Sequence, residues 1–231
     1  MKNLYLISSP FQALCATEAK EYFRLNNNIA LIVNYANDSS ENIQQIQNII
    51  ALSQWDEIII IGAEIKNSKY KEYLKRLFLL KKYIYENIFV GHFGQFQHII
   101  LGSLDYKKSF VIDDGVITLD LHKNELNPFR DKKQKILKKL KTLRYRIFGF
   151  TPIFDKEKLH YFTIFKLQSY YGEEIIFNKF LFLKKHLENK KQDLDSVYFL
   201  GQPLMPDLMS LEDYIKNLMY VQKYFYKRKK N

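Results

Sequence analysis

Two adjacent aspartates and a glycine, Asp113, Asp114 and Gly115, follow the apolar residues 109–112. A buried strand is expected to end there, and in open α/β sheets ligands collect at the carboxyl ends of the strands. A carboxylate at that edge can serve as a general base. Asp114 has the freer approach because Gly115 lets a substrate come close to the backbone, and Asp113 is expected to orient the loop. The alternative is an Asp-Asp-Gly turn selected for turn chemistry alone.

A second group of polar residues lies in the segment GHFGQFQ, residues 91–97, which follows another expected strand and opens a helix. His92 could bind a substrate or a phosphate, and the first-turn amides near Gly94 and Gln95 could support an anion. The alternative is a glycine-containing connector with a solvent-facing histidine. The glycine spacing is not that of a dinucleotide-binding fingerprint, and the segment follows the fourth expected strand rather than the first.

The N-terminal segment SSPFQ, residues 8–12, closes the first expected strand at the same edge. The hydroxyls of Ser8 and Ser9 and the amides at the helix start could contact sugar hydroxyls or a phosphate. Gln12 belongs to the same candidate substrate-binding group. The alternative is that the serines only cap the helix.

Apolar strands and helical segments alternate about five times in the first half of the chain. The spacing predicts strands at residues 4–8, 29–34, 57–62, 87–91 and 109–112, and helices at residues 11–25, 40–52, 68–85 and 95–104. An N-cap for the second helix is expected within residues 38–40. Residues 57–62 are almost all isoleucine, as in a strand covered on both faces. The alternation predicts an α/β protein with a doubly wound, mainly parallel Rossmann-like sheet.

The alternation changes after Leu121. The stretch from Lys132 to Arg146 is expected to form a strongly basic helix, residues 161–167 a strand and residues 173–190 another helix. A fresh strand at residues 196–201 and a helix at residues 210–227 complete the chain. A lone βα unit cannot bury both faces of its strand. Residues 1–195 are therefore expected to form an N-terminal lobe, and residues 196–231 the opening of an incomplete second lobe.

The charge balance points to anionic partners. The 231 residues include 36 Lys and Arg against 25 Asp and Glu, a formal net charge of +11. Nucleotide sugars, acidic glycans, nucleic acid and phospholipid headgroups all fit such a surface. No recognisable nucleic-acid-binding motif is present. The basic helix from Lys132 to Arg146 is either a solvated amphipathic helix or a peripheral contact with an anionic inner membrane.

The cysteine and histidine content limits the chemistry and the compartment. Cys15 is the single cysteine, so a disulfide framework and a cysteine metal cluster are excluded. The five histidines show no ligand-like pairing, and no metal site is expected. The longest apolar stretch, residues 58–63, is far shorter than the roughly 20 residues of a membrane span. A cytoplasmic location is expected.

Three segments resemble bacterial sialyltransferases of the two-lobed Rossmann-like type. They are LYLISSPFQ from Leu4 to Gln12, the Asp113-Asp114-Gly115 motif, and YFLGQP from Tyr198 to Pro203. The resemblance is greatest to glycosyltransferase family 52, the lipooligosaccharide and capsule sialyltransferase group, and to its polysialyltransferase relatives. The segments occur in order over most of the chain, and the Asp-Asp-Gly element is the chemically specific one.

This resemblance implies the N-terminal lobe of a GT-B-type glycosyltransferase. The implied reaction is an inverting transfer of sialic acid from CMP-sialic acid to a hydroxyl of a surface glycan, with no metal ion and no cofactor. Asp114 would be the general base that takes the proton of the acceptor hydroxyl. The CMP would be held mainly by the second lobe, where Gly201 and Gln202 are the candidate substrate-binding residues.

The chain departs from this family in its second lobe. Family members carry a His-Pro or similar histidine motif there that assists departure of the phosphate, but this chain has no His-Pro dipeptide and no histidine after His186. The chain alone is therefore expected to show little or no transferase activity. Two alternatives stay open: another nucleotide-sugar transferase of capsule or lipooligosaccharide synthesis, and a non-catalytic protein that binds an acidic glycan or nucleic acid.

Overall fold

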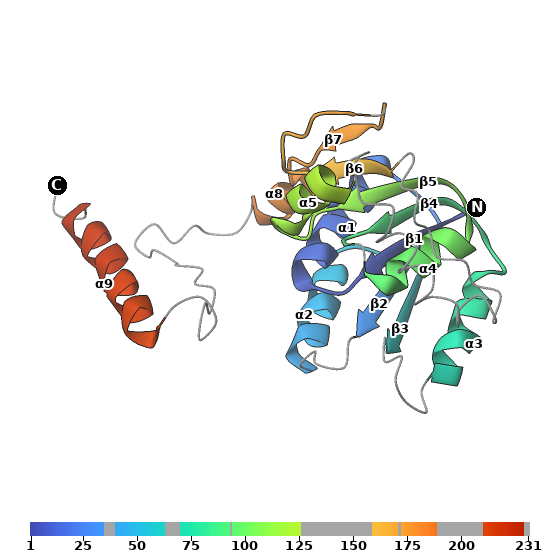
Figure 1. The fold of residues 1–231 in the computed structure, drawn as a ribbon, viewed down its shortest axis with the longest axis horizontal. Coiled ribbons are helices and arrows are strands. Elements are labelled where there is room, and N and C mark those ends of the chain that lie inside the picture. The colour runs from blue at the N-terminus through green and yellow to red at the C-terminus, as the bar shows by residue number, and fades with distance from the viewer. Residues whose placement is uncertain are drawn as a thin grey trace. The chain divides into compact units, whose positions relative to one another are not determined.

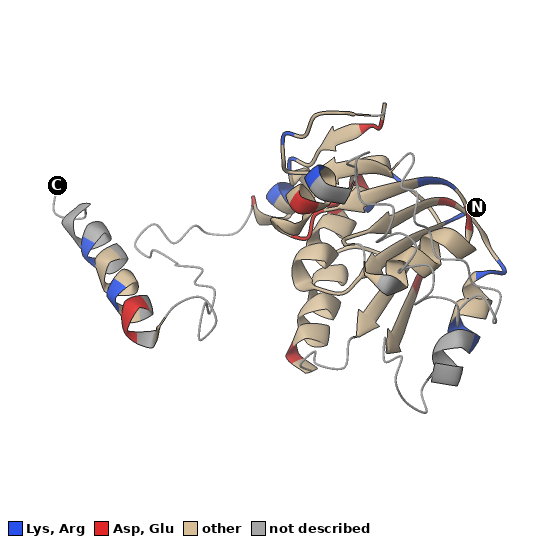
Figure 2. Cartoon of the chain, in the orientation of Figure 1, with Lys and Arg blue, Asp and Glu red and all other residues tan. Residues whose placement is uncertain are grey.

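The computed structural model describes residues 1–34, 40–62, 70–92, 94–125, 159–170, 172–188 and 210–228. The chain divides into two compact units, Met1–Asn189 and Lys190–Asn231. The first unit contains a parallel sheet with helices on both faces (Figure 1). The second contains the described helix α9 (Leu211–Arg228), which has Glu212 and Asp213 in its first turn (Figure 2).

Seven strands form the sheet, and every neighbouring pair is parallel. They are β1 (Lys2–Ile7), β2 (Asn28–Asn34), β3 (Glu57–Gly62), β4 (Ile84–Val90), β5 (Asp105–Ile112), β6 (Leu159–Thr163) and β7 (Ile175–Phe177). Their order across the sheet is β3-β2-β1-β4-β5-β6-β7. The chain moves outward from β1 to β3 and then resumes at β4 on the other side of β1. This reversal makes the fold a doubly wound, Rossmann-like α/β sheet, as predicted, and it creates a topological switch point between β1 and β4.

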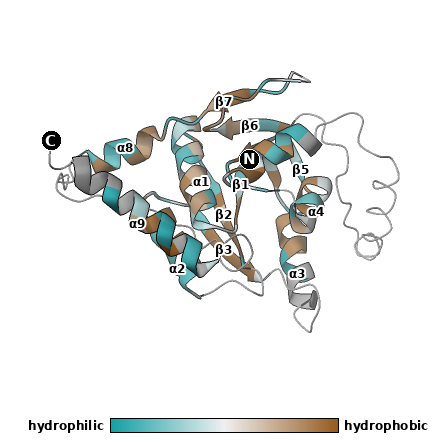
Figure 3. Ribbon diagram, turned by 60° about the vertical axis from the view of Figure 1, so that its left-hand side comes forward, coloured by the Kyte–Doolittle hydropathy of each residue, from teal (hydrophilic) through white to brown (hydrophobic). Residues whose placement is uncertain are grey.

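The helices of the first unit cover both faces of the sheet. They are α1 (Pro10–Phe23), α2 (Ser40–Ile50), α3 (Tyr70–Leu80), α4 (Gln95–Ser103), α5 (Ile117–Asp120) and α8 (Leu181–Leu187), with a short π-helical turn η1 (Leu121–Glu125) after α5. In β1, Leu4 and Leu6 pack into a core with side chains of α3 and α4, whereas Tyr5 and Ile7 pack with α1 and α2. The period-2 alternation of a strand therefore supplies two separate cores. In Figure 3, which colours residues by hydropathy, strands β2 and β3 are mainly brown and therefore hydrophobic.

Helix α1 begins directly after β1 and is fixed at both ends. Pro10 occupies its first turn, where a missing amide hydrogen is tolerated. The Ser9 hydroxyl caps the helix by accepting a hydrogen bond from the backbone amide of Gln12 at 3.2 Å. At the other end, Arg24 adopts a left-handed conformation with φ of 50°, and its amide donates to a carbonyl of the last turn. The helix start is therefore anchored at the carboxyl end of β1.

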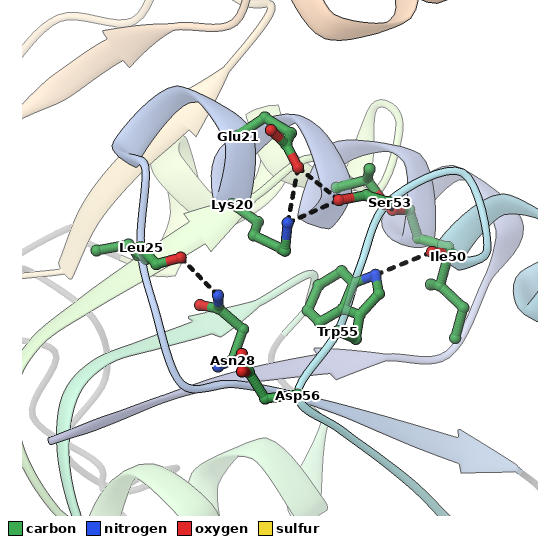
Figure 4. A network of polar contacts seen from close by, with 10 residues as sticks. Lys20, Glu21, Leu25, Asn28, Ile50, Ser53, Trp55 and Asp56 are labelled. Atoms are coloured by element: carbon green, nitrogen blue, oxygen red, sulfur yellow. Dashed lines mark hydrogen bonds and ion pairs between the residues drawn. The ribbon is translucent and has the colours of Figure 1, made fainter.

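A polar network anchors the far end of α1 to the segment after α2 (Figure 4). The Lys20 ammonium donates to Glu21 Oε1 and to Ser53 Oγ, both at 2.6 Å, and the Ser53 hydroxyl also donates to Glu21. The indole of Trp55 donates to the Ile50 carbonyl at 3.0 Å. The two helices on this face are thereby joined by charge-assisted hydrogen bonds at the end of the sheet remote from the Asp-Asp-Gly loop.

Two expectations about the elements were wrong. Strand β3 lies at the edge of the sheet, and Ile58 and Ile60 are 51% and 37% exposed, so its isoleucines do not reflect cover on both faces. Residues 173–190 do not form one helix: β7 pairs with β6, and α8 begins only at Leu181. The Asn178 side chain accepts a hydrogen bond from the Phe180 amide, and Phe180 has φ of 51°, which separates the strand from the helix.

Several expectations concern residues that the structure does not describe. The N-cap positions Asp38 and Ser39, the basic helix from Lys132 to Arg146, and the strand at residues 196–201 all lie outside the described residues. The helix expected at residues 210–227 is α9. No helix in the described ranges combines the length and the apolar character needed to cross a membrane.

Candidate active site at the carboxyl edge of the sheet

Three residues from different strand ends meet at the switch point. Ser9 follows β1, His92 follows β4, and Asp114 follows β5. The Ser9 hydroxyl donates to Asp114 Oδ1 at 3.3 Å, and His92 Nδ1 lies 3.8 Å from Asp114 Oδ2. Because β1, β4 and β5 are adjacent and parallel, their following loops emerge side by side at one edge.

The two aspartates have different surroundings. Asp113 is fully buried and accepts hydrogen bonds from the Thr163 hydroxyl at 2.5 Å and from the Ile164 amide at 2.7 Å. Burial raises the pKa of Asp113, and these hydrogen bonds only partly oppose that effect. Asp113 therefore ties the end of β5 to the end of β6. The side chain of Asp114 stays 18% exposed, so it is the carboxylate that a solute can reach.

The backbone around Asp114 is held by a tight turn. The Asp114 amide donates to the Thr118 hydroxyl at 3.1 Å, and Gly115 has φ of +64°. A side chain at position 115 would have open space, but its backbone would be strained in the left-handed region. The motif therefore forms a turn and also leaves the Asp114 carboxylate partly exposed at the carboxyl edge of the sheet.

His92 is largely buried between the ends of β1, β4 and β5, with 24% of its side chain exposed. Burial lowers the pKa of His92, and the negative charge of Asp114 opposes this with a smaller effect. The ring therefore favours its neutral form near neutral pH, although a carboxylate lies within 4 Å.

Gln12 connects His92 to the end of β1. The residue is 1% exposed. Its Oε1 accepts hydrogen bonds from the Ser8 backbone amide at 2.8 Å and the Ser8 hydroxyl at 3.0 Å, and its Nε2 lies 3.3 Å from His92 Nδ1. A Cβ atom at Gly91 would lie 2.3 Å from Gln12 Cδ. The glycine is therefore required for this side chain to pass between the two strand ends.

The other candidate residues take varied positions. Ser8 contacts the site through Gln12, Gly94 is the N-cap of α4, and Gln95 opens that helix. Gly201 and Gln202 lie outside the described residues. Ser9 caps α1, and its hydroxyl also contacts Asp114. Contact of Ser8 or Ser9 with a sugar hydroxyl or a phosphate stays a prediction.

Two residues that hold the aspartates were missed in the sequence. Thr163 bonds to Asp113 and ends β6, and Thr118 holds the Asp114 amide. Thr163 ends β6 in the structure, but it lies inside the strand expected at residues 161–167, so its place at a strand end gave no signal in the sequence. Thr118 lies four residues after Asp114, the spacing at which a hydroxyl accepts from a nearby backbone amide.

The arrangement can accept a proton from a bound hydroxyl. Asp114 provides the carboxylate, and Ser9 and His92 provide polar atoms on either side of it. Among the described residues, no three His, Cys, Asp or Glu side chains lie close enough together to bind a metal ion.

Comparison with known proteins leaves this geometry as the main guide to function. No protein-family model matches the chain, and no curated protein shows a significant match to its sequence.

Proposed function

We propose that this chain provides the acceptor-side lobe of a sialyltransferase-like glycosyltransferase of the two-lobed GT-B type, with Asp114 as general base. The observation that carries the proposal is the partly exposed carboxylate of Asp114 at the switch point, flanked by Ser9 and His92 while Asp113 is buried. The resemblance of the Asp-Asp-Gly motif and the N-terminal segment to glycosyltransferase family 52 supports the choice of reaction.

In the proposed reaction, an acceptor glycan places one hydroxyl against Asp114. The carboxylate takes the hydroxyl proton as the hydroxyl oxygen forms a bond to the anomeric carbon of sialic acid. The bond from that carbon to the CMP phosphate breaks, and its electron pair leaves with the phosphate. Attack opposite the leaving group inverts the anomeric centre. Ser9 and His92 bind the acceptor or the carboxylate of the sugar.

The proposal also gives roles to two other parts of the chain, one from the resemblance and one from the basic pattern of the sequence. Residues 196–231, with Gly201 and Gln202, belong to the donor side, where CMP-sialic acid is bound. The stretch from Lys132 to Arg146 provides peripheral contact with the anionic inner membrane, on whose cytoplasmic side surface glycans are built. The net charge of +11 also fits a non-catalytic protein that binds an acidic glycan or nucleic acid, and this is the competing hypothesis.

The test is a binding experiment on the isotope-labelled 231-residue protein. CMP-sialic acid, a panel of neutral and sialylated oligosaccharides, and a short DNA duplex are added separately, and backbone amide signals are followed by NMR. The proposal expects an oligosaccharide to shift the signals of Ser9, His92 and Gly115, and expects Asp114→Asn to weaken that binding.

A different result would favour the competing hypothesis. Salt-sensitive shifts caused by DNA, with no oligosaccharide-induced change at Ser9 or Gly115, would replace the glycosyltransferase proposal by simple anion binding. Because the chain alone is expected to show little or no transfer from CMP-sialic acid, oligosaccharide binding compared between wild type and Asp114→Asn is the decisive measurement.

A further inference from the structure

The hydrogen-bond pattern around Gln12 fixes the orientation of its amide. The Ser8 backbone amide can only donate, and it lies 2.8 Å from Gln12 Oε1. Turning the amide over would place the Gln12 NH₂ group against the Ser8 N–H, two donors facing each other. The NH₂ group must therefore face His92, 3.3 Å from Nδ1.

This orientation determines the role of His92 Nδ1. The amide of Gln12 can only donate at Nε2, so Nδ1 has to accept. In a neutral imidazole, one nitrogen accepts and the other carries the proton. The proton of neutral His92 must therefore be on Nε2.

The same contact works against protonation of the ring. A proton on Nδ1 would point at the Gln12 NH₂ group, although Asp114 Oδ2 is only 3.8 Å away and would favour a positive ring. Among the described residues, Asp114 is the charged group that acts on the ring, and the neutral Gln12 amide is the group that occupies Nδ1. A histidine beside a carboxylate ordinarily donates to it, and here the amide occupies the nitrogen that would do so.

We propose that Gln12 is a positioning residue that holds His92 in the Nε2-protonated tautomer and keeps its Nδ1 from donating a hydrogen bond to Asp114. Asp114 Oδ2 then receives no hydrogen bond from Nδ1 of the neighbouring ring. The consequence for catalysis rests on the proposed function, because it matters only if Asp114 is a base. The tautomer itself does not depend on that function.

The packing supports this role over simple core filling. Gln12 is almost fully buried, and its amide oxygen satisfies both the Ser8 amide and the Ser8 hydroxyl. Gly91, the residue before His92, leaves the space that the Gln12 amide occupies, since a Cβ there would overlap Gln12 Cδ and Cγ at 2.3 and 2.5 Å. The backbone just before His92 therefore leaves room for the Gln12 side chain, which orients the His92 ring.

The test is NMR of the imidazole nitrogens in the isotope-labelled protein across a pH titration, with the His92 signals assigned by a His92→Asn variant. The wild type is expected to show an unprotonated Nδ1 and a protonated Nε2. Gln12→Glu places a carboxylate, an acceptor, against Nδ1. It is expected to move the proton to Nδ1 and to raise the pKa of His92 above the wild-type value.

A second variant keeps the proposal testable if a buried glutamate prevents folding. Gln12→Met retains length and removes the donor, so the ring is expected to populate both tautomers and its pKa to rise under the influence of Asp114. His160 is the internal control: its Nδ1 accepts from the Glu174 amide at 3.0 Å, and its tautomer should not respond to either variant.

Two results would overturn the proposal. One is a wild-type His92 protonated on Nδ1, and the other is an unchanged tautomer and pKa in both Gln12 variants. The oligosaccharide-binding experiment gives a separate result. Loss of glycan binding with the tautomer as expected would remove the proposed function and leave the positioning role of Gln12 intact.

Discussion

Ser9 and Asp114 are separated by 105 positions in the sequence, yet the Ser9 hydroxyl donates to Asp114 Oδ1 at 3.3 Å. The contact joins the end of β1 to the end of β5, with β4 between them in the sheet. The Ser9 hydroxyl also accepts a hydrogen bond from the backbone amide of Gln12 at the start of α1. The Ser9 side chain therefore both caps the helix and contacts the carboxylate.

Replacing Ser9 by alanine should affect both stability and binding. Loss of the cap should lower the free energy of unfolding by about 0.5–2 kcal/mol. Loss of the contact with Asp114 should weaken oligosaccharide binding. Ser9→Thr retains the hydroxyl and should restore most of both properties. Urea denaturation and NMR titration measure the two effects, and equal binding by wild type and Ser9→Ala would remove Ser9 from the site.

The two aspartates should respond differently to the same substitution. Asp113→Asn leaves one carbonyl oxygen to accept from Thr163 and Ile164, so unfolding free energy should fall by about 1–3 kcal/mol. Asp114→Asn should change stability by about 0.5 kcal/mol or less. Any transferase activity of the wild type should fall about 10²- to 10⁴-fold in Asp114→Asn. Transfer that survives this substitution would show that Asp114 is not the base.

Thr163→Val should destabilise the protein in a pH-dependent way. The variant removes a hydrogen bond to the buried Asp113 carboxylate, and unfolding free energy should fall by about 1–3 kcal/mol. It should also raise the pKa of Asp113 further. A raised carboxyl pKa in the folded state means that stability is lost as pH rises through that pKa.

The loss of unfolding free energy caused by Thr163→Val should therefore be larger at about pH 7 than at about pH 4. Thr163→Ser keeps the hydroxyl and is the matched control. Chemical denaturation at the two pH values checks this. A deficit that is the same at both would mean that the hydroxyl contributes packing and not support of the charge.

Gly91→Ala should be destabilising because its Cβ would overlap Gln12. Overpacking of this kind lowers unfolding free energy by about 1–3 kcal/mol. A Cβ at Gly62, also at the carboxyl end of a strand, would meet no atom within 4 Å in the described part of the chain, so Gly62→Ala is the control and should be neutral or slightly stabilising. In a Gln12→Ala background the effect of Gly91→Ala should shrink, and a double-mutant cycle measures this coupling. Additive effects would argue against the contact.

Lys20→Met should weaken the network that anchors the end of α1. Burial alone would raise the pKa of Glu21, but hydrogen bonds from Lys20 and Ser53 lower it below its ordinary value. A lowered carboxyl pKa contributes stability above the unfolded-state pKa, and this is lost as pH falls through the folded-state pKa. The difference between Lys20→Met and wild type should therefore be larger at about pH 7 than at about pH 3.

The expected size of the Lys20→Met effect is modest. About a third of the Glu21 side chain is exposed, so solvent screens the pair, and a loss of about 1 kcal/mol or less is expected. Lys107→Met, which breaks the more exposed pair between Lys107 and Glu86, is the matched control and should have a smaller effect. Thermal or urea unfolding of both variants tests the comparison.

Part of this site could be predicted because residues that follow parallel strands gather at the carboxyl edge of the sheet. Ser9, His92 and Asp114 each follow an apolar run, and parallel strands bring such positions to one edge. Thr163 was missed because its partner Asp113 lies 50 residues earlier, so no local spacing connects them. Gln12 was grouped with substrate contacts from its place in the chain, but its side chain is buried against Ser8 and His92.

The fold was predictable where local patterns decide it. The bounds of β3, Glu57–Gly62, are those predicted around the isoleucines at residues 58–61, but its exposure depends on its place at the sheet edge. Strand β7 was mistaken for helix because it has three residues and forms by pairing with β6. Just before β7, the buried Glu173 accepts a hydrogen bond from the backbone amide of Tyr170. A charged residue at this position did not suggest that a strand follows.

The bond between Thr163 and Asp113 also suggests how relatives of this chain can be recognised. An Asp-Asp-Gly tripeptide is short enough to recur by chance, but a buried aspartate that needs two donors constrains a distant position as well. In related sequences, a hydroxyl residue at the position of Thr163 should accompany the first aspartate and be lost together with it. Covariation of these two sites would be a longer and more selective signature than the tripeptide.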